Sequence, residues 1–93
     1  MILTSFQSHV ITEVLKDSKQ SSAHVVSQML RLNSYDLSKL TPHDRRLLHE
    51  ILEAEKIGTD SNRLVVLLEV LNMISSLRIT LGEEAYPPFP KSF

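Results

Sequence analysis

The stretch from Leu64 to Leu81 constrains the fold more than any other part of the chain, because it is the longest apolar segment in the sequence. Drawn as a helix with about 100° per residue, it has one narrow polar stripe. That stripe is formed by Asn62, Glu69, Asn72, Ser76 and Thr80. Apolar side chains spread over well more than half of the circumference, whereas a helix that packs on one side usually shows an apolar stripe only about 100° wide. This helix therefore needs burial on two sides, either as the middle helix of its domain or against another chain.

A membrane span is the other interpretation of so apolar a segment. A span needs about 20 apolar residues, and a charge at its centre costs about 2.5–3.5 kcal/mol. Glu69, Asn72 and Arg78 interrupt the run, and neither an aromatic belt nor a cluster of Lys and Arg flanks it. The sequence therefore favours burial in a protein core and predicts no membrane contact.

The composition indicates one small globular domain. With 93 residues, of which 42% are hydrophobic and 23% charged, the chain has the balance of a folded protein. A domain of this size buries only about 60–65% of its unfolded surface, so self-association is a common way to gain stability. The net charge of −1 argues against broad electrostatic capture of nucleic acid. Cysteine is absent, which excludes disulfides and thiolate zinc sites, and no signal peptide is recognised, so we expect a cytoplasmic protein.

The spacing of apolar residues predicts an all-α fold. The four helices are expected at about residues 5–17, 22–33, 42–57 and 60–81. With two glycines and no useful alternation of apolar and polar residues, strands have little support. Thr4 and Gln7 have the spacing of a capping box at the start of the first helix. Thr41 and Pro42 suit the N-cap and first position of the third helix, and Gly58 is expected to end it in a left-handed conformation.

The C-terminal segment differs from the rest of the chain in its prolines and aromatic residues. Gly82 is expected to close the fourth helix, and the prolines that follow lack an amide donor and favour an extended conformation. The chain therefore divides into a helical domain, residues 1–82, and an extended tail, residues 83–93. Tyr86 and Phe89 make this tail a candidate ligand for a groove on a partner, or a strap over its own core.

No motif in the sequence supports catalysis or cofactor binding. His49 and Glu50 begin like the His-Glu-x-x-His motif of zinc proteases, in which two imidazoles four residues apart reach the metal. Here the second imidazole is replaced by Glu53, and no third ligand is indicated. Neither a Gly-x-Ser-x-Gly elbow nor a glycine-rich phosphate loop is present. We therefore expect no enzyme activity, no cofactor and no bound metal.

A helix-turn-helix unit is the alternative interpretation. Apolar residues between Val26 and Leu40 lie where such a unit would bury them. However, the turn position, which usually holds glycine, is Arg31, and Pro42 cuts short the helix that would read DNA. That helix carries only Lys39 as a cation. A DNA-binding transcriptional regulator is therefore the alternative and not the favoured function.

Three short runs of the sequence carry a family resemblance. They are residues 10–17, with Thr-Glu-x-Leu-Lys-Asp, residues 25–30, and residues 46–53. Together these runs resemble the small enterobacterial two-component connector proteins of the biofilm and acid-resistance group. The resemblance, which covers residues 10–53, implies a short helical protein that dimerises and acts by binding regulators. The long fourth helix and the proline tail depart from that family.

These observations favour a non-enzymatic regulatory or adaptor protein that works as a homodimer or as half of a heterodimer. On the fourth helix, the predicted interface is a line of residues spaced by four, three and four positions. In the tail, the aromatic residues are predicted to make a second contact. The predicted interface residues are Val66, Val70, Met73, Leu77, Tyr86 and Phe89.

Overall fold

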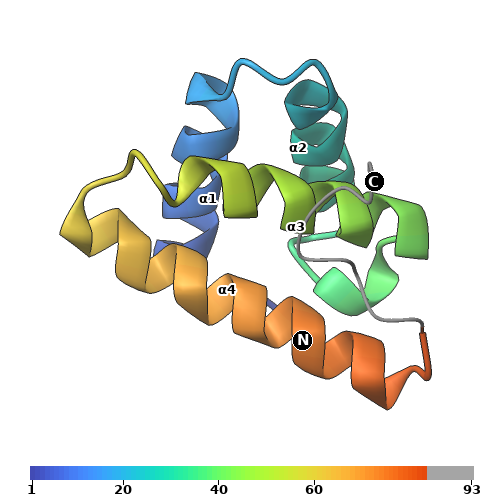
Figure 1. The fold of residues 1–93 in the computed structure, drawn as a ribbon. Coiled ribbons are helices and arrows are strands. Elements are labelled where there is room, and N and C mark those ends of the chain that lie inside the picture. Colours follow the sequence, from blue (N-terminus) through green and yellow to red (C-terminus); the bar gives the residue numbers. More distant parts are fainter. Residues whose placement is uncertain (84–93) are drawn as a thin grey trace, which may run out of the picture.

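Four α-helices and one short 3₁₀ helix make up the part of the chain that the structure, a computed structural model, describes, which is residues 1–83. In chain order they are α1 (Ser5–Asp17), α2 (Ser22–Leu32), η1 (Leu37–Lys39), α3 (Pro42–Glu55) and α4 (Ser61–Thr80). Their arrangement is shown in Figure 1. The predicted all-α fold with four helices is confirmed, and each helix end lies within two residues of its expected position. The predicted tail contacts at Tyr86 and Phe89 lie outside the described residues.

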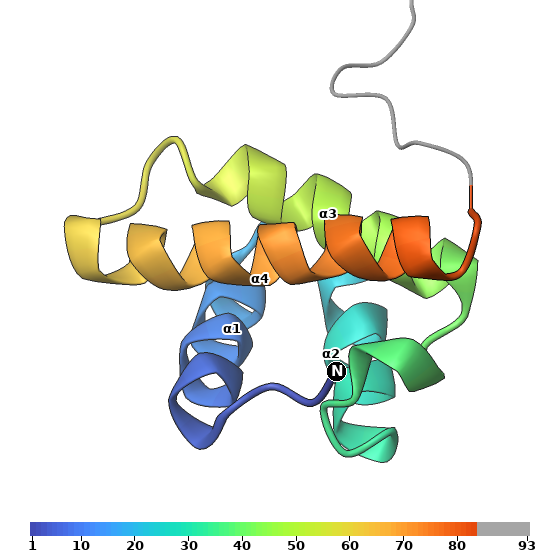
Figure 2. The same ribbon diagram turned by 90° about the horizontal axis from the view of Figure 1, so that it is seen from below.

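The helices form two hairpins that pack against each other. α1 and α2 run antiparallel behind, and α3 and α4 run antiparallel in front, so that the chain forms two layers (Figure 1). Seen from below, α3 and α4 lie in the upper layer, and the α1–α2 hairpin hangs beneath them (Figure 2). α1 packs against α4 and α2 packs against α3. The long apolar helix therefore has neighbours from both hairpins.

The ends of the helices follow from local sequence. Thr4 and Gln7 form both hydrogen bonds of the predicted capping box, at 3.1 and 2.9 Å. The Thr41 hydroxyl accepts a hydrogen bond from the Asp44 amide at 3.1 Å, and Gly82 ends α4 with a φ of 71°. The expectation for Gly58 is wrong, because this residue does not take a positive φ. α3 instead ends at Glu55, and the turn that follows stays on the right-handed side.

One core of buried aliphatic side chains holds the two layers together. Every helix contributes to it, and so do Leu37 of η1 and Leu40. The most completely buried members are Ile11, Val26, Leu30, Leu37, Leu48, Ile51, Leu52, Leu67, Val70 and Ile74. Burying each such side chain stabilises the fold by about 1.5–3 kcal/mol. Ile57, in the turn after α3, lies outside this core and is 86% exposed.

The N-terminal residues form a clasp that the sequence does not predict. The Leu3 amide donates to the Tyr35 carbonyl and the Leu37 amide to the Met1 carbonyl, each at 2.9 Å. Asp36 lies between these bonds, and a hydrogen bond from the Ser38 hydroxyl, at 2.6 Å, holds the pKa of its carboxyl below the usual range. The clasp fastens the start of α1 to the segment that follows α2.

A buried arginine joins η1, α3 and the end of α4. The Arg45 side chain is only 2% exposed, and its guanidinium donates hydrogen bonds to the carbonyls of Leu37 and Leu40 and to the Glu83 carboxylate. A buried charge needs such partners, because an unpaired one is very unfavourable in the core. Glu83, which the sequence assigns to the start of the tail, is therefore tied to the helical domain.

The helices of residues 1–83 do not include one that is both long enough and apolar enough to cross a membrane. α4 comes nearest in length, with 20 residues, but its charged and polar positions lower its hydropathy. The expected burial of this helix in a protein core is what the structure shows.

Candidate functional site

The outward side of α4 is unusually poor in charge. Eight residues of this helix are exposed, and Glu69 is the one charged residue among them. The eight are Ser61, Asn62, Val65, Leu68, Glu69, Asn72, Ile79 and Thr80. Val65, Leu68 and Ile79 are 58%, 48% and 67% exposed. A surface helix ordinarily turns charged and polar residues to solvent, so this set of eight, here named the α4 outer face, is a candidate binding surface.

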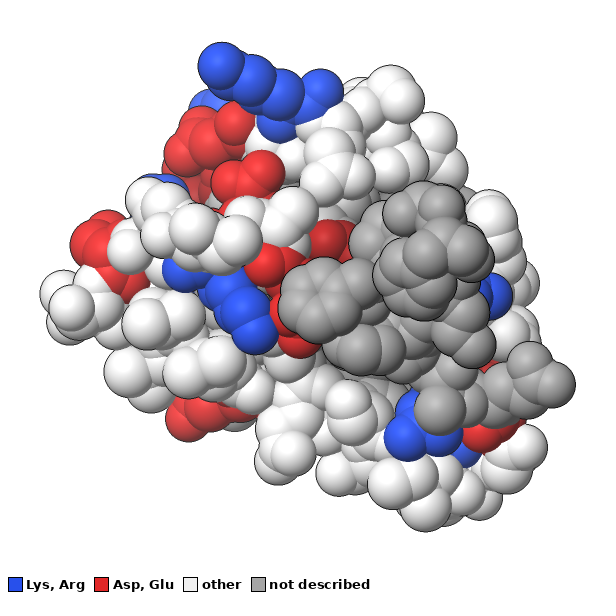
Figure 3. Space-filling view, viewed as in Figure 1, with Lys and Arg blue, Asp and Glu red and all other residues white. Residues whose placement is uncertain are grey.

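The two arginines of α4 do not contribute positive charge to this face. The Arg63 guanidinium lies 3.6 Å from the Asp17 carboxylate of α1. Arg78 donates to the Glu83 carbonyl at 3.4 Å. Both side chains are half-buried at the flanks of the helix. In Figure 3 the surface along the lower edge, over α4, is correspondingly mostly white, while charges gather above it.

The predicted interface line on α4 faces the chain's own core. Val66, Val70 and Leu77 are buried, and Met73 packs against the same cluster. The prediction that these residues form a surface is therefore corrected. The physical reason is that α1 and α3 both pack on α4 and between them cover this side of the helix. The polar stripe does point to solvent, as Asn62, Glu69 and Asn72 show.

The exposed apolar residues of α4 are those that lie within or beside the polar stripe. Val65, Leu68 and Ile79 share the outward side with Asn72 and Glu69. Sequence reasoning missed them because it looked for a continuous apolar line. The signal that would have found them is the interruption of the polar stripe by aliphatic residues at positions where a solvated helix carries charges.

Further exposed apolar residues lie at the start of the chain. Ile2 and Phe6 are both exposed to more than half. Figure 2 shows α4 crossing the view, with the N-terminal clasp running below it from the start of α1 toward η1. α1 packs against the core-facing side of α4, so these residues are not part of the α4 outer face.

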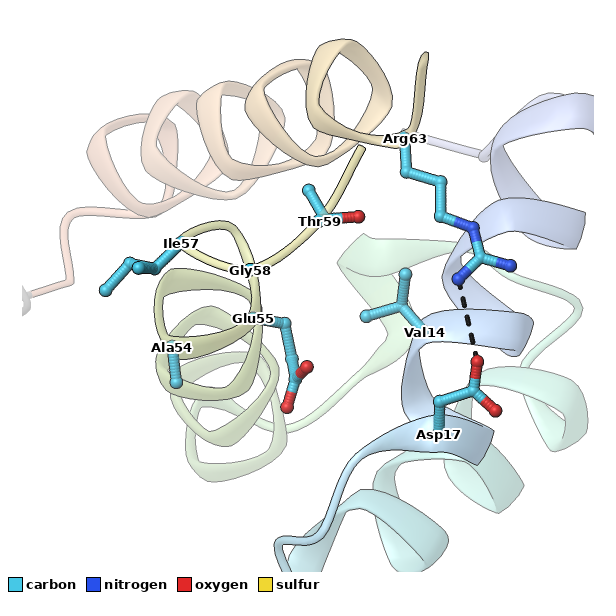
Figure 4. Close-up of a pocket in the computed structure, with 8 residues that line it drawn as sticks. All are labelled: Val14, Asp17, Ala54, Glu55, Ile57, Gly58, Thr59 and Arg63. Atoms are coloured by element: carbon cyan, nitrogen blue, oxygen red, sulfur yellow. Dashed lines mark ion pairs between the residues drawn. The ribbon is translucent and has the colours of Figure 1, made fainter. Parts of the chain in front are cut away.

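A shallow hollow of about 480 Å³ lies at the opposite end of α4 from Gly82. It is lined by Val14, Asp17, Ala54, Glu55, Ile57, Gly58, Thr59 and Arg63. In Figure 4, Arg63 reaches from the start of α4 toward Asp17 at the end of α1. The ion pair gives this hollow a structural role, because it ties two helices of different layers across its mouth.

A second hollow, of about 420 Å³, lies between α1 and α2. Lys16, His24 and Arg31 line it together with serine and glutamine side chains. The charged side chains among them, Lys16 and Arg31, are exposed, so they are well solvated and not held in one geometry. This groove separates two helices that already pack on the common core.

His49 and Glu53, the pair that resembles half of a zinc motif, are placed close together. His49 Nε2 lies 3.9 Å from Glu53 Oε1, and the Glu53 carboxylate also pairs with Lys56 Nζ at 2.8 Å. Burial lowers the pKa of the His49 imidazole, against the opposing effect of Glu53 and Glu50. Among residues 1–83, no three His, Cys, Asp or Glu side chains gather as a metal site requires.

The segment that would read DNA in a helix-turn-helix unit does not form such a helix. Between Ser34 and Leu40 the chain makes turns and the three residues of η1. Leu37 and Leu40 are buried in the core, and the Leu37 and Leu40 carbonyls bind Arg45. A recognition helix must lie in the major groove with its side chains free, so this segment does not meet the requirement.

No family model, no curated protein and no solved structure matches the chain. The functional argument therefore rests on the surface itself. Of the surfaces described above, the α4 outer face is the one whose composition departs furthest from that of a solvated helix.

Proposed function

We propose that this protein is a non-enzymatic regulatory or adaptor protein that acts by binding protein chains through the α4 outer face. The observation that carries the proposal is the exposure of Val65, Leu68 and Ile79 on a face with a single charge. The centres of protein interfaces are depleted of charged residues in the same way. The resemblance of residues 10–53 to connector proteins, which act by binding regulators, supports the same function.

The aliphatic side chains of this face supply part of the free energy that binding requires. Covering the exposed parts of three aliphatic side chains contributes on the order of 3 kcal/mol, before the cost of association. Asn72 and the hydroxyl groups of Ser61 and Thr80 add hydrogen-bonding groups at its centre and ends. A partner with an apolar helix or groove therefore gains both contact area and directional bonds.

The proposal is tested by cross-linking in extracts of the native host. The full chain is compared with a variant that carries Val65→Glu and Leu68→Glu, and cross-linked polypeptides are identified by mass spectrometry. We expect the wild type to give one defined product, with its own copy or with another protein, and the variant to lose it. Both residues are exposed in the folded chain, so the substitutions leave the core intact.

The matched control is a charge reversal on the neighbouring helix, Arg46→Glu with Glu50→Arg. These residues face solvent and pair with each other at 3.8 Å, so the reversed pair keeps the fold and the net charge. The control variant is expected to form the same product as the wild type. Equal products from the α4 variant and the wild type would place the binding surface elsewhere.

A further inference from the structure

The hollow between α1 and α2, here named the α1–α2 groove, is lined by basic and neutral side chains and by no carboxylate. Its basic members are Lys16, His24 and Arg31. Six further side chains carry hydroxyl or amide groups, namely Thr12, Ser18, Gln20, Ser21, Ser27 and Gln28. The chain has 11 acidic residues and a net charge of −1, so a groove of about 420 Å³ without an acid is a distinct electrostatic environment. Such a groove attracts negatively charged ligands.

Small residues make room for the groove, and apolar residues form its floor. Ala23 and Ser27 lie four positions apart on one face of α2, which leaves space beside α1. Leu15 and Ala23, which are 3% and 2% exposed, lie at the base of this space. Both belong to the close-packed core, which deforms little. A ligand in the groove therefore meets a fixed apolar floor between polar walls.

Lys16 and Arg31 carry positive charges that the described chain does not neutralise. Neither side chain forms an ion pair within residues 1–83. Other exposed or half-buried cations do pair with carboxylates, namely Arg46 with Glu50, Lys56 with Glu53 and Arg63 with Asp17. Asp17, which follows Lys16 in the sequence, thus lines the other hollow and faces Arg63. The positive charge of the α1–α2 groove is therefore available to a ligand.

The basic side chains are attached at two ends of the groove. α1 and α2 run antiparallel and are joined by a short loop, so Lys16 in the last turn of α1 lies at the same end as His24, near the start of α2 (Figure 1). Arg31 follows His24 by seven residues, which is about 10 Å along the helix axis. Ser27 and Gln28 lie between these ends on α2. A matching ligand has negative groups at both ends of an uncharged, hydrogen-bonding body.

We infer that the α1–α2 groove binds a small molecule with phosphate groups at both ends of a hydroxylated body, as in a sugar bisphosphate. This inference goes beyond the proposed function, because it concerns a different surface from the α4 outer face. Guanidinium and ammonium groups form short, strong hydrogen bonds with phosphate oxygens. The hydroxyl and amide groups of the groove form hydrogen bonds with the hydroxyl groups of the ligand. Among the described residues no Trp, Tyr or Phe lines the groove, so it lacks the stacking surface that a nucleobase uses.

The exposure of the two cations sets the expected affinity. Solvent weakens each contact between an exposed cation and a phosphate, so we expect a dissociation constant on the order of 1 mM. Lys16 and Arg31 also lie in the last turns of their helices, where a positive charge stabilises the helix dipole. A change in stability alone therefore does not test the inference, and the experiment has to measure ligand binding.

NMR titration of the full, isotopically labelled chain with fructose 1,6-bisphosphate tests the inference. An ionic strength of about 0.15 M screens charges that lie more than about 8 Å apart, which suppresses long-range attraction between the chain and the anion. We expect the backbone amides of Ser18, Ser21, Ser27 and Arg31 to shift along one saturating curve, while the amides of α4 keep their positions. Shifts that do not saturate, or that occur equally beside all exposed cations, would overturn the inference.

The double variant Lys16→Gln with Arg31→Gln removes both charges. These residues are exposed, so the fold is kept, and the amide spectrum itself checks this. We expect the dissociation constant for fructose 1,6-bisphosphate to rise by at least about tenfold. The matched control, Lys39→Gln with Arg46→Gln, removes two exposed cations that do not line the groove and should bind as the wild type does. An equal loss of binding in the control would mean that net charge alone is responsible, and would contradict the inference.

Three comparison compounds decide the class of ligand. Fructose lacks the phosphates and should cause no shifts, and citrate has its carboxylates close together and should bind at least about tenfold more weakly than the bisphosphate. Equal binding of citrate would assign the groove to anions in general and would overturn the phosphate assignment. A short duplex DNA that shifts the same amides, when the bisphosphate does not, would assign the groove to nucleic acid and would likewise overturn the inference.

Discussion

α3 and α4 lie side by side in one layer, yet they present different surfaces to their surroundings (Figure 1). Both bury aliphatic side chains in the same core. On its outer side, α3 exposes Arg46 and Glu50, whose side chains form an ion pair at 3.8 Å. α4 exposes aliphatic side chains and a single charge, Glu69. The inner sides explain the fold, and the difference between the outer sides is the basis for proposing α4 as the binding surface.

The largest effect is expected from two neighbouring leucines of α4. Leu67 is fully buried and Leu68 is 48% exposed. Leu67→Ala should lower the free energy of unfolding by about 4 kcal/mol, because it leaves a cavity in the core. Leu68→Ala should lower it by about 0.5 kcal/mol in the monomer. Urea unfolding at low protein concentration measures both, and similar losses would mean that the outward side of α4 is misassigned.

The next largest loss of stability is expected at Arg45 of α3, which is compared with its neighbour Arg46. Arg45→Ala removes the buried partner of the Glu83 carboxylate and of two carbonyls, and should cost about 3 kcal/mol of unfolding free energy. Arg46→Ala removes an exposed ion pair with Glu50 and should cost about 0.5 kcal/mol. Thermal unfolding of the two variants compares the inner and outer sides of α3 directly. If Arg46→Ala lowered the free energy of unfolding as much as Arg45→Ala, the inner and outer sides of α3 would not differ as described.

The pH dependence of the free energy of unfolding is expected to report on His49 of α3, whose pKa responds to charged groups of both α3 and α4. Burial lowers the pKa of His49 below its usual 6.5, although Glu53 and Glu50 act in the opposite direction, and Lys56 and Arg78 lower it further. Near and below pH 6.5 the unfolded chain therefore binds more protons than the folded one. This contribution to stability is full above that pH and is lost as the pH falls toward the lowered pKa.

His49→Gln removes this titration. We expect the free energy of unfolding of the wild type to fall more between pH 7 and pH 5 than that of the variant. Urea unfolding at a series of pH values measures the difference. Parallel pH curves for the two proteins would show that His49 titrates as it does in the unfolded chain.

The smallest change in stability is expected in the turn between α2 and η1, outside α3 and α4. Ser34 and Tyr35 have φ values of 55° and 57°, in the left-handed region that favours glycine. Ser34→Gly should raise the free energy of unfolding by up to about 1 kcal/mol. Ser27→Gly, within α2, is the matched control and should lower it by about 0.5 kcal/mol. Equal changes in thermal stability would contradict the assigned turn.

Local sequence predicts where the helices lie, but it does not predict which side of α4 faces solvent. The start of a helix is set by residues a few positions apart, such as Thr4 with Gln7, so the sequence predicts the capping box of α1 and the N-cap of α3 directly. The side of α4 that faces the core depends on where α1 and α3 pack, which is a property of the whole chain. For this reason the sequence pattern predicts Val66 and Val70 at an interface and does not single out Val65 and Leu68.

Arg45 and its neighbour Arg46 show the same limit of prediction from local sequence. Arg45 and Arg46 are adjacent and chemically identical, and the sequence alone gives them the same expectation. The structure buries the first and exposes the second, because only Arg45 reaches the Leu37 and Leu40 carbonyls and Glu83. A partner that lies 38 positions away in the sequence, as Glu83 does, is not visible in a local pattern.

The N-terminal clasp couples the opening motions of distant parts of the chain. The backbone amides of Leu3 and Leu37 are bonded on the two sides of the same short contact, so hydrogen exchange at both requires one shared opening event. When the clasp opens, η1 remains held through Arg45 and through the buried side chain of Leu37. Opening of the first residues therefore does not by itself release the last turn of α4, because Arg45 still holds the Glu83 carboxylate.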